Sequence, residues 1–182
     1  MKYDIIYADP PWKYRHCASN SRKIENKYPT MELEEIKNLN IPCKENSLLY
    51  MWATAPKLKE ALEVMCSWNF DYRTCAIWDK KTIGMGYWFR NRHEILLVGV
   101  KGQFSPPKQH DRIESIIISK KDNHSHKPDF IRTLITRWYP DKTKIELFAR
   151  QRFDDWDVWG NQAPNIIQNT LGKFENKKQV KA

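Results

Sequence analysis

The residues best suited to chemistry are Asp9-Pro10-Pro11-Trp12, which follow a short apolar stretch near the start of the chain. They supply a carboxylate, two carbonyls from residues without a competing N–H, and a large flat ring. This set suits a primary amine on a flat heterocycle. Asp9 and the Pro10 carbonyl would accept the two N–H bonds, so that the nitrogen recovers the lone pair delocalised into the ring, while Trp12 stacks on that ring. The alternative is a rigid turn in which Asp9 caps nearby amides.

The charge balance predicts an acidic partner. The 182 residues include 31 Lys plus Arg and 22 Asp plus Glu, a formal net charge of +9. Aromatic residues stand next to basic ones in Trp12-Lys13-Tyr14-Arg15 and Tyr87-Trp88-Phe89-Arg90. Basic groups hold phosphates and aromatic faces stack on bases, so the pattern favours a nucleic acid. The alternative is that most of these rings belong to the core.

Other classes of protein fit the sequence poorly. No apolar stretch approaches the roughly 20 residues of a membrane-spanning helix, and Met1-Lys2-Tyr3-Asp4 does not open a secretory signal. The four cysteines lie far apart without CxxC spacing, and His124-Ser125-His126 has no second ligand pair at zinc-site spacing. We therefore predict a cytoplasmic protein with reduced cysteines, no metal site and no membrane contact.

The hydrophobic pattern predicts strands that alternate with helices. Short apolar runs predict strands at residues 3–8, 47–53, 72–78, 94–100, 116–118 and 144–149. Helical spacing predicts helices at residues 30–36 (with Thr30 as N-cap), 56–65 and 128–139. The side chains expected to face the core from the last two are Leu58, Ala61, Leu62, Met65, Phe130, Leu134, Ile135 and Trp138.

Such alternation predicts an α/β domain with a mainly parallel sheet, which binds its ligands beyond the carboxyl ends of the strands. Asp9 follows the first of these strands, and residues 150–162 follow the last. The basic residues 79–81 and the stretch 84–92 lie between two middle strands. We expect one domain over residues 1–172, followed by a flexible basic tail at 173–182 that either contacts nucleic acid or only aids solubility.

Seven short segments, in this order, carry a resemblance to a known family. They are Ala8-Asp9-Pro10-Pro11-Trp12, Tyr28-Pro29-Thr30-Met31, Leu39-Asn40-Ile41-Pro42, Leu97-Val98-Gly99-Val100-Lys101-Gly102, Ser125-His126-Lys127-Pro128-Asp129, Lys144-Ile145-Glu146-Leu147-Phe148-Ala149-Arg150 and Gly160-Asn161-Gln162. The chain resembles the MT-A-seventy family of adenine-N6 methyltransferases over nearly its whole length. The stretch Gly86-Tyr87-Trp88-Phe89-Arg90-Asn91 looks most like its bacterial and phage branch.

The resemblance implies a Rossmann-like methyltransferase fold, S-adenosylmethionine as cofactor and direct methyl transfer without a metal. The protein's task in such a transfer is mainly to align the amine with the methyl group. An adenine inside a duplex is out of reach, so the base must be unpaired or flipped out. DNA is the expected substrate, with RNA as the first alternative. A non-catalytic nucleic-acid-binding partner subunit is the second, and a monomer or a homodimer is equally compatible with the sequence.

The resemblance also implies roles for single residues. Asp9 and Pro10 match the amine acceptors, with Asp9 also beside the cofactor, and Pro11 and Trp12 complete the catalytic motif. The positions matched to the cofactor are Lys127, Phe148, Arg150, Asn161 and Gln162, and those matched to the acceptor nucleotide are Trp12, Tyr28, Glu94, Ser125 and His126. Phe148 in the core, His126 ordering a helix start, and Asn161 with Gln162 capping a turn are the structural alternatives.

Two departures from the family pattern limit what is carried over. Many relatives have a strand before the catalytic one whose end contacts the adenosine of the cofactor, whereas Asp9 here has only eight residues before it. A polar residue expected shortly after Arg150 falls near Phe153. We therefore expect the contacts to the cofactor's ribose to differ from the family pattern.

Overall fold

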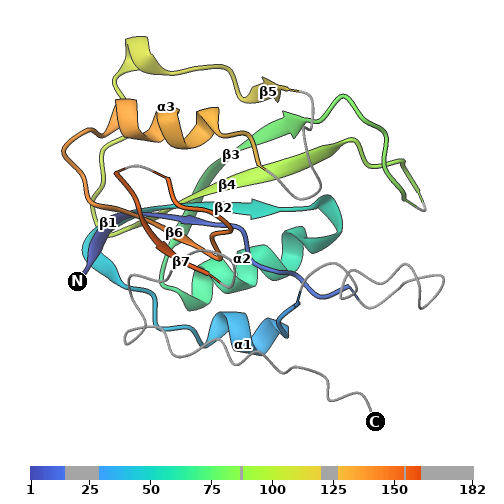
Figure 1. Ribbon diagram of the computed structural model, residues 1–182, viewed down its shortest axis with the longest axis horizontal. Helices are drawn as coiled ribbons and strands as arrows, with labels where there is room; N and C mark the ends of the chain where they lie inside the picture. The colour runs from blue at the N-terminus through green and yellow to red at the C-terminus, as the bar shows by residue number, and fades with distance from the viewer. Residues whose placement is uncertain (15–28, 87, 120–126, 154, 161–182) are drawn as a thin grey trace.

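The structure is a computed structural model that describes residues 1–14, 29–86, 88–119, 127–153 and 155–160. Within these ranges seven strands form one sheet in the order β5-β3-β4-β2-β1-β6-β7 (Figure 1). The elements are β1 (Tyr3–Ala8), α1 (Leu33–Lys37), β2 (Cys43–Ala53), η3 (Ala55–Lys57), α2 (Leu58–Ser67), β3 (Asp71–Asp79), β4 (His93–Lys101), η4 (Gln109–Asp111), β5 (Ile116–Ile118), α3 (Phe130–Trp138), β6 (Lys144–Leu147) and β7 (Asp157–Trp159).

The sheet is mostly parallel, as predicted, and β4 is its antiparallel strand. β1 pairs in parallel with β2 and β6, and β7 with β6, whereas β4 runs antiparallel to both β2 and β3. The carboxyl ends of β1, β2, β3 and β6 therefore meet the amino end of β4 at one edge of the sheet, which we call the carboxyl edge. A residue at the start of β4 thus lies at the same edge as Asp9, which follows β1.

Helices cover both faces of the sheet, so its central strands are buried on both sides. Figure 1 shows α1 and α2 on one face and α3 on the other. Alternate residues of β1 join the two resulting cores, Ile6 on the α1–α2 side and Ile5 and Tyr7 on the α3 side. The continuous apolar run of this strand is explained by burial on both faces. This arrangement is that of a Rossmann-like methyltransferase fold.

Several element boundaries differ from the sequence prediction. The first helix begins at Leu33, not at Thr30, because Met31 pairs with Trp12 in an isolated parallel bridge and stays extended. The N-cap is instead Glu32, whose N–H donates to Glu35 Oε2 at 2.8 Å. β2 begins four residues earlier than expected, at Cys43, and β7 was not predicted at all.

Three side chains predicted to face the core are exposed instead. Leu58 and Leu62 of α2 and Phe130 of α3 are 36%, 37% and 42% exposed. Val64 and Ile131 are buried in the same helices, so each helix is rotated slightly from the expected orientation. None of the helices in the described ranges is long and apolar enough to cross a membrane.

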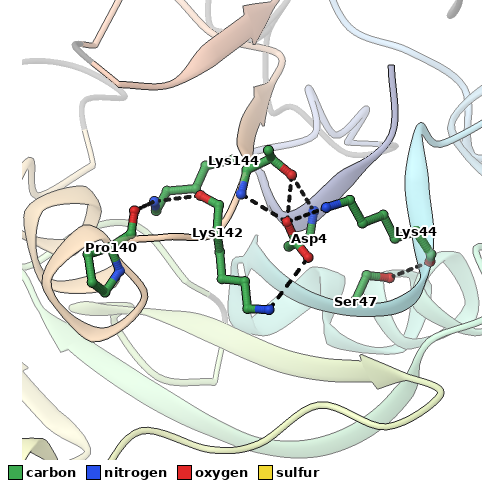
Figure 2. A network of polar contacts seen from close by, with 7 residues as sticks. Asp4, Lys44, Ser47, Pro140, Lys142 and Lys144 are labelled. Atoms are coloured by element: carbon green, nitrogen blue, oxygen red, sulfur yellow. Dashed lines mark hydrogen bonds and ion pairs between the residues drawn. The ribbon is translucent and has the colours of Figure 1, made fainter.

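The edge opposite the carboxyl edge is held together by Asp4 (Figure 2). Its Oδ2 accepts hydrogen bonds from Lys44 Nζ at 2.7 Å, from Thr143 Oγ1 at 2.6 Å and from the Thr143 N–H at 2.9 Å. Burial raises the pKa of this carboxyl, but these donors outweigh burial and lower the pKa to about 2. Asp4 therefore fixes the starts of β1, β2 and β6 relative to one another, which helps to align their carboxyl ends.

Candidate active site

Asp9-Pro10-Pro11-Trp12 forms an anchored turn at the end of β1. The Trp12 N–H donates to the Pro10 carbonyl at 2.8 Å, and the Met31 N–H donates to the Pro11 carbonyl at 3.0 Å. A carbonyl oxygen has two lone pairs, so the Pro10 carbonyl retains one acceptor position beside Asp9. The turn therefore presents a carboxylate and a carbonyl oxygen from consecutive residues at the carboxyl edge.

Trp12 is part of the core. Only 5% of the residue is exposed, and its indole N–H donates to the Trp52 carbonyl at 3.2 Å. The indole packs in the cluster on the α1–α2 side of the sheet. This position fixes the turn after β1, and it leaves little ring surface for stacking on a base. Its stacking role remains a prediction.

An alternating row of four charges runs across the carboxyl edge from Asp9. Lys127 Nζ donates to Asp9 Oδ2 at 2.6 Å and lies 3.3 Å from Glu94 Oε2. Glu94 Oε1 accepts a hydrogen bond from Lys80 Nζ at 3.2 Å. The side chain of Lys127 is only 10% exposed and that of Glu94 13%. The structure thus brings together three of the predicted site residues, and Lys80 extends the row.

Burial and pairing shift the pKa values of this row in opposite directions. Burial alone would lower the pKa of Lys127, but the carboxylates of Asp9 and Glu94 outweigh it and raise that pKa, so the ammonium is charged throughout the neutral range. Burial raises the pKa of Glu94, but Lys127 and Lys80 outweigh it and lower the pKa. For Asp9, burial prevails over the attraction of Lys127 and raises its pKa.

A second buried ion pair lies on the α3 side of Asp9. Arg132 of α3 donates to both carboxylate oxygens of Glu146 in β6, at 2.7 and 3.1 Å. Glu146 is directly opposite Tyr7 in the β1–β6 ladder, and the Arg132 guanidinium lies 5.5 Å from the centre of the Tyr7 ring. The pair therefore ties α3 to the strands whose ends carry the site.

A small cavity of about 20 Å³ opens beside Asp9, with room for about one water molecule. Its walls include three residues predicted for the cofactor, Lys127, Phe148 and Arg150, together with the Arg132–Glu146 pair and Gln151. The chain turns sharply at Phe148, whose φ is 63°, and the Phe148 ring packs edge-on against Trp159 with centroids 5.4 Å apart. The ends of β1 and β6 thus share one polar cavity.

Gly160 allows the chain after β7 to pass close to the end of β6. A Cβ atom at this position would lie 2.1 Å from the Ala149 carbonyl oxygen and 2.4 Å from its nitrogen. No side chain fits that space, because both neighbouring atoms belong to the backbone. The glycine therefore allows the end of β7 to lie directly against the end of β6.

The chemistry of these residues fits S-adenosylmethionine. The cofactor carries a carboxylate, an ammonium group, a sulfonium centre and an adenine ring. Lys127 has three N–H donors, and its two polar partners within the described ranges are Asp9 and Glu94, so a third donor can bind a carboxylate. Asp9 supplies a negative charge for the cationic groups, and Phe148 a flat ring. Among the described residues, no group of three His, Cys, Asp or Glu side chains could hold a metal ion.

Five predicted site residues lie outside the described residues. They are Tyr28, Ser125, His126, Asn161 and Gln162. Conversely, the sequence analysis missed Arg132, Glu146 and Lys80. Glu146 could have been predicted, because an acidic residue inside the otherwise apolar run of a buried strand requires a buried partner of opposite charge or a hydrogen-bond donor.

Comparison with known proteins agrees with this geometry. The family model MT-A70 matches residues 3–162. The chain is 34% identical over 199 aligned positions to the "Type II methyltransferase M.MunI" of Mycoplasma sp, covering 97% of this chain and 85% of that protein. It is 30% identical to the human "N(6)-adenosine-methyltransferase catalytic subunit METTL3" and 31% identical to the Danio rerio METTL3 subunit, but it spans only 29% of the length of each. The chain therefore belongs to the MT-A70 family of adenine-N6 methyltransferases.

Proposed function

We propose that the chain transfers a methyl group from S-adenosylmethionine to the 6-amino group of adenine in DNA, with the base unpaired or flipped out of the helix. The observation that carries this proposal is the Asp9 carboxylate, held by the buried Lys127 at 2.6 Å beside the free acceptor position of the Pro10 carbonyl. Two acceptors from consecutive residues match the two N–H donors of one amine. No general base is needed before the transfer.

The residues of the turn hold and orient the amine. When Asp9 and the Pro10 carbonyl accept both N–H bonds, the nitrogen is drawn towards tetrahedral geometry and its lone pair becomes available. Orientation of this kind can lower a barrier by several kcal/mol. Lys127 holds the Asp9 carboxylate in one position and favours its ionised form against the effect of burial. After the transfer, the excess proton on the nitrogen is released towards Asp9.

We assign the cofactor to the carboxyl edge around Asp9, where the small cavity is one part of its site. Lys127 would bind its carboxylate, and Phe148 and Arg150 would lie beside its ribose and adenine, to which we also assign Asn161 and Gln162. Bound there, the cofactor supplies a methyl group on a positively charged sulfur. Glu94, Tyr28, Ser125 and His126 are assigned to the nucleotide side, together with the exposed part of Trp12.

DNA is the proposed polymer because the relation to the Mycoplasma type II methyltransferase extends over 85% of that protein, whereas the METTL3 proteins are matched over 29% of their length. RNA is the second candidate, because the METTL3 names specify adenosine, a ribonucleoside. A non-catalytic nucleic-acid-binding subunit is the third. The complete Asp9 to Trp12 turn and its ion pair with Lys127 argue against it.

The proposal includes the organisation of the chain. Residues 1–172 form one methyltransferase domain, the basic tail at 173–182 either contacts nucleic acid or only aids solubility, and the protein works in the cytoplasm as a monomer or homodimer. The net charge of +9 supports a polynucleotide as its partner.

To test the proposal, the purified protein is incubated with labelled cofactor and with single-stranded DNA, duplex DNA or RNA of the same sequence. Each product is then digested to nucleosides. We expect N6-methyldeoxyadenosine. If the only product is N6-methyladenosine from RNA, the substrate of the enzyme is RNA and not DNA. A protein that binds all three polymers but methylates none would be a binding subunit. Cofactor binding is followed separately by calorimetry, in which Lys127→Met should weaken binding even if no substrate is found.

A further inference from the structure

The hairpin between β3 and β4 carries the most exposed aromatic side chains among the described residues. We call residues 80–92 the hairpin tip; Tyr87 lies outside the described residues. Trp88 is 95% exposed, Phe89 85%, Met85 78% and Ile83 57%. In Figure 1 the hairpin extends past the carboxyl edge and away from the rest of the sheet. Exposed apolar groups in such a cluster mark interaction sites.

The tip keeps its shape without burying these rings. The Gly84 N–H donates to the Asn91 carbonyl at 2.7 Å, and the Lys80 N–H donates to the Arg92 carbonyl at 3.0 Å. Gly86 is required for the close crossing, because a Cβ atom there would lie 1.9 Å from the Phe89 carbonyl oxygen. Backbone hydrogen bonds therefore present Trp88 and Phe89 to the outside.

The hairpin base keeps the same backbone in place. Arg92 donates to both oxygens of Asp79, at 2.6 and 2.5 Å. Glu94, two residues further on, lies 3.3 Å from Lys127, which in turn binds Asp9. Trp88 precedes Glu94 by six positions in the chain, so their Cα atoms lie at most roughly 20–22 Å apart. The tip and the proposed amine acceptors thus belong to one connected edge.

The charges around the exposed rings favour a polynucleotide over a protein partner. The tip contains Lys80, Lys81, Arg90 and Arg92 and no acidic residue. A second copy of this chain, which also carries a net charge of +9, would bring positive charge to a positive tip. Cations beside aromatic rings suit phosphates beside bases.

We propose that Trp88 and Phe89 form a wedge that inserts between base pairs of duplex DNA and takes the place of a stacked base, so that a nearby adenine can leave the helix and reach Asp9. The inference rests on the proposed function. It adds that the enzyme requires the hairpin tip to act on duplex DNA. Apolar wedges that unstack a base step are a general way for proteins to distort a duplex. An adenine that is already unpaired needs no such help.

The test compares the Trp88→Ala/Phe89→Ala variant with wild type on one oligonucleotide, offered single-stranded, in a matched duplex, and in a duplex with a mismatch at the methylated adenine. Losing the stacking of one base should lower kcat/KM on the matched duplex between about 5-fold and about 150-fold. The loss should be smaller on the mismatched duplex and under 2-fold on the single strand. Tyr72→Ala removes an exposed aromatic ring from the far end of β3 and should change none of these rates.

A second measurement does not depend on methyl transfer. Permanganate oxidises thymines that are unstacked, so the wild-type protein should create reactive thymines in a duplex and the double variant should not. If wild type methylates nothing but opens the duplex through the tip, the proposed function fails and the wedge stands. Unchanged permanganate reactivity in the variant, or equal loss of rate on single strands and duplexes, would overturn the wedge. The wedge would also be overturned if the double variant lost self-association but still opened the duplex, because the tip would then be an interface between copies of this chain.

Discussion

Replacing Lys127 by methionine removes the cation that lies between the partly buried carboxylates of Asp9 and Glu94, and it keeps most of the side-chain volume. Asp9 and Glu94 then face each other, at positions where Lys127 lay 2.6 and 3.3 Å away. Removing one partner of a buried ion pair costs roughly 3–5 kcal/mol, and we expect a loss in this range in the free energy of unfolding. Lys80→Met is the control. Within the described ranges the Lys80 ammonium pairs with Glu94, which keeps Lys127 as a second partner in this variant, so about 1–2 kcal/mol should be lost.

The same substitution should depend on pH in a defined direction. The raised pKa of Lys127 means that its ammonium contributes stability at every pH below the lysine range. Its benefit requires ionised carboxylates, so the loss in Lys127→Met should be largest at neutral pH and should shrink as the pH falls through the raised pKa of Asp9 and then the lowered pKa of Glu94. Adding Glu94→Gln to Lys127→Met should recover part of the loss, because only one buried carboxylate remains.

Urea unfolding of the four proteins, monitored by circular dichroism at several pH values, measures these differences. A Lys127→Met loss of 1 kcal/mol or less, equal to that of Lys80→Met and constant with pH, would refute the ion pair as the element that holds Asp9.

Three further predictions test the fold and the site. Asp4→Asn should lower the free energy of unfolding by about 2 kcal/mol near pH 7, because the pKa of the Asp4 carboxyl is lowered to about 2 in the folded protein. This loss should disappear as the pH falls from about 4 to 2. An unchanged urea midpoint at pH 7 would contradict the prediction. Gly160→Ala should cost about 1–3 kcal/mol and weaken cofactor binding in calorimetry, because the added Cβ overlaps the Ala149 backbone; normal affinity would show that this close contact is not needed. The single-turnover rate should fall at acid pH with an apparent pKa above that of an ordinary aspartate, since burial raises the pKa of Asp9. If the rate falls only at or below about pH 4, Asp9 is not the carboxylate that accepts the amine.

The sequence predicted most of the sheet because each strand has a local signature. The run at residues 3–8 is apolar throughout, and Asp9 and Pro10 end it abruptly. β7 lacked such a signature, because three residues, one of them Asp157, are too few to show a period. The start of α1 was missed for a different reason, since the bridge between Trp12 and Met31 is a long-range contact.

The site was predictable as a set of residues, but not as an arrangement. The motif at the end of the first strand pointed to Asp9, and the family resemblance pointed to Glu94 and Lys127. That Lys127 binds both carboxylates follows from the antiparallel direction of β4, which no local pattern shows. The burial of Trp12 likewise depends on Trp52, 40 residues away.

The proposed role of Asp9, which is to hold the adenine amine during transfer, is tested by the single-turnover rate of Asp9→Asn at saturating cofactor, with the methylated nucleoside identified by mass spectrometry. Asparagine keeps one acceptor oxygen but points an NH₂ donor at the amine or at Lys127. We predict that wild type forms N6-methyldeoxyadenosine and that Asp9→Asn is at least about a hundredfold slower while still binding the cofactor. A variant rate within about tenfold of wild type, or a methyl group on any other atom of the nucleoside, would contradict the account.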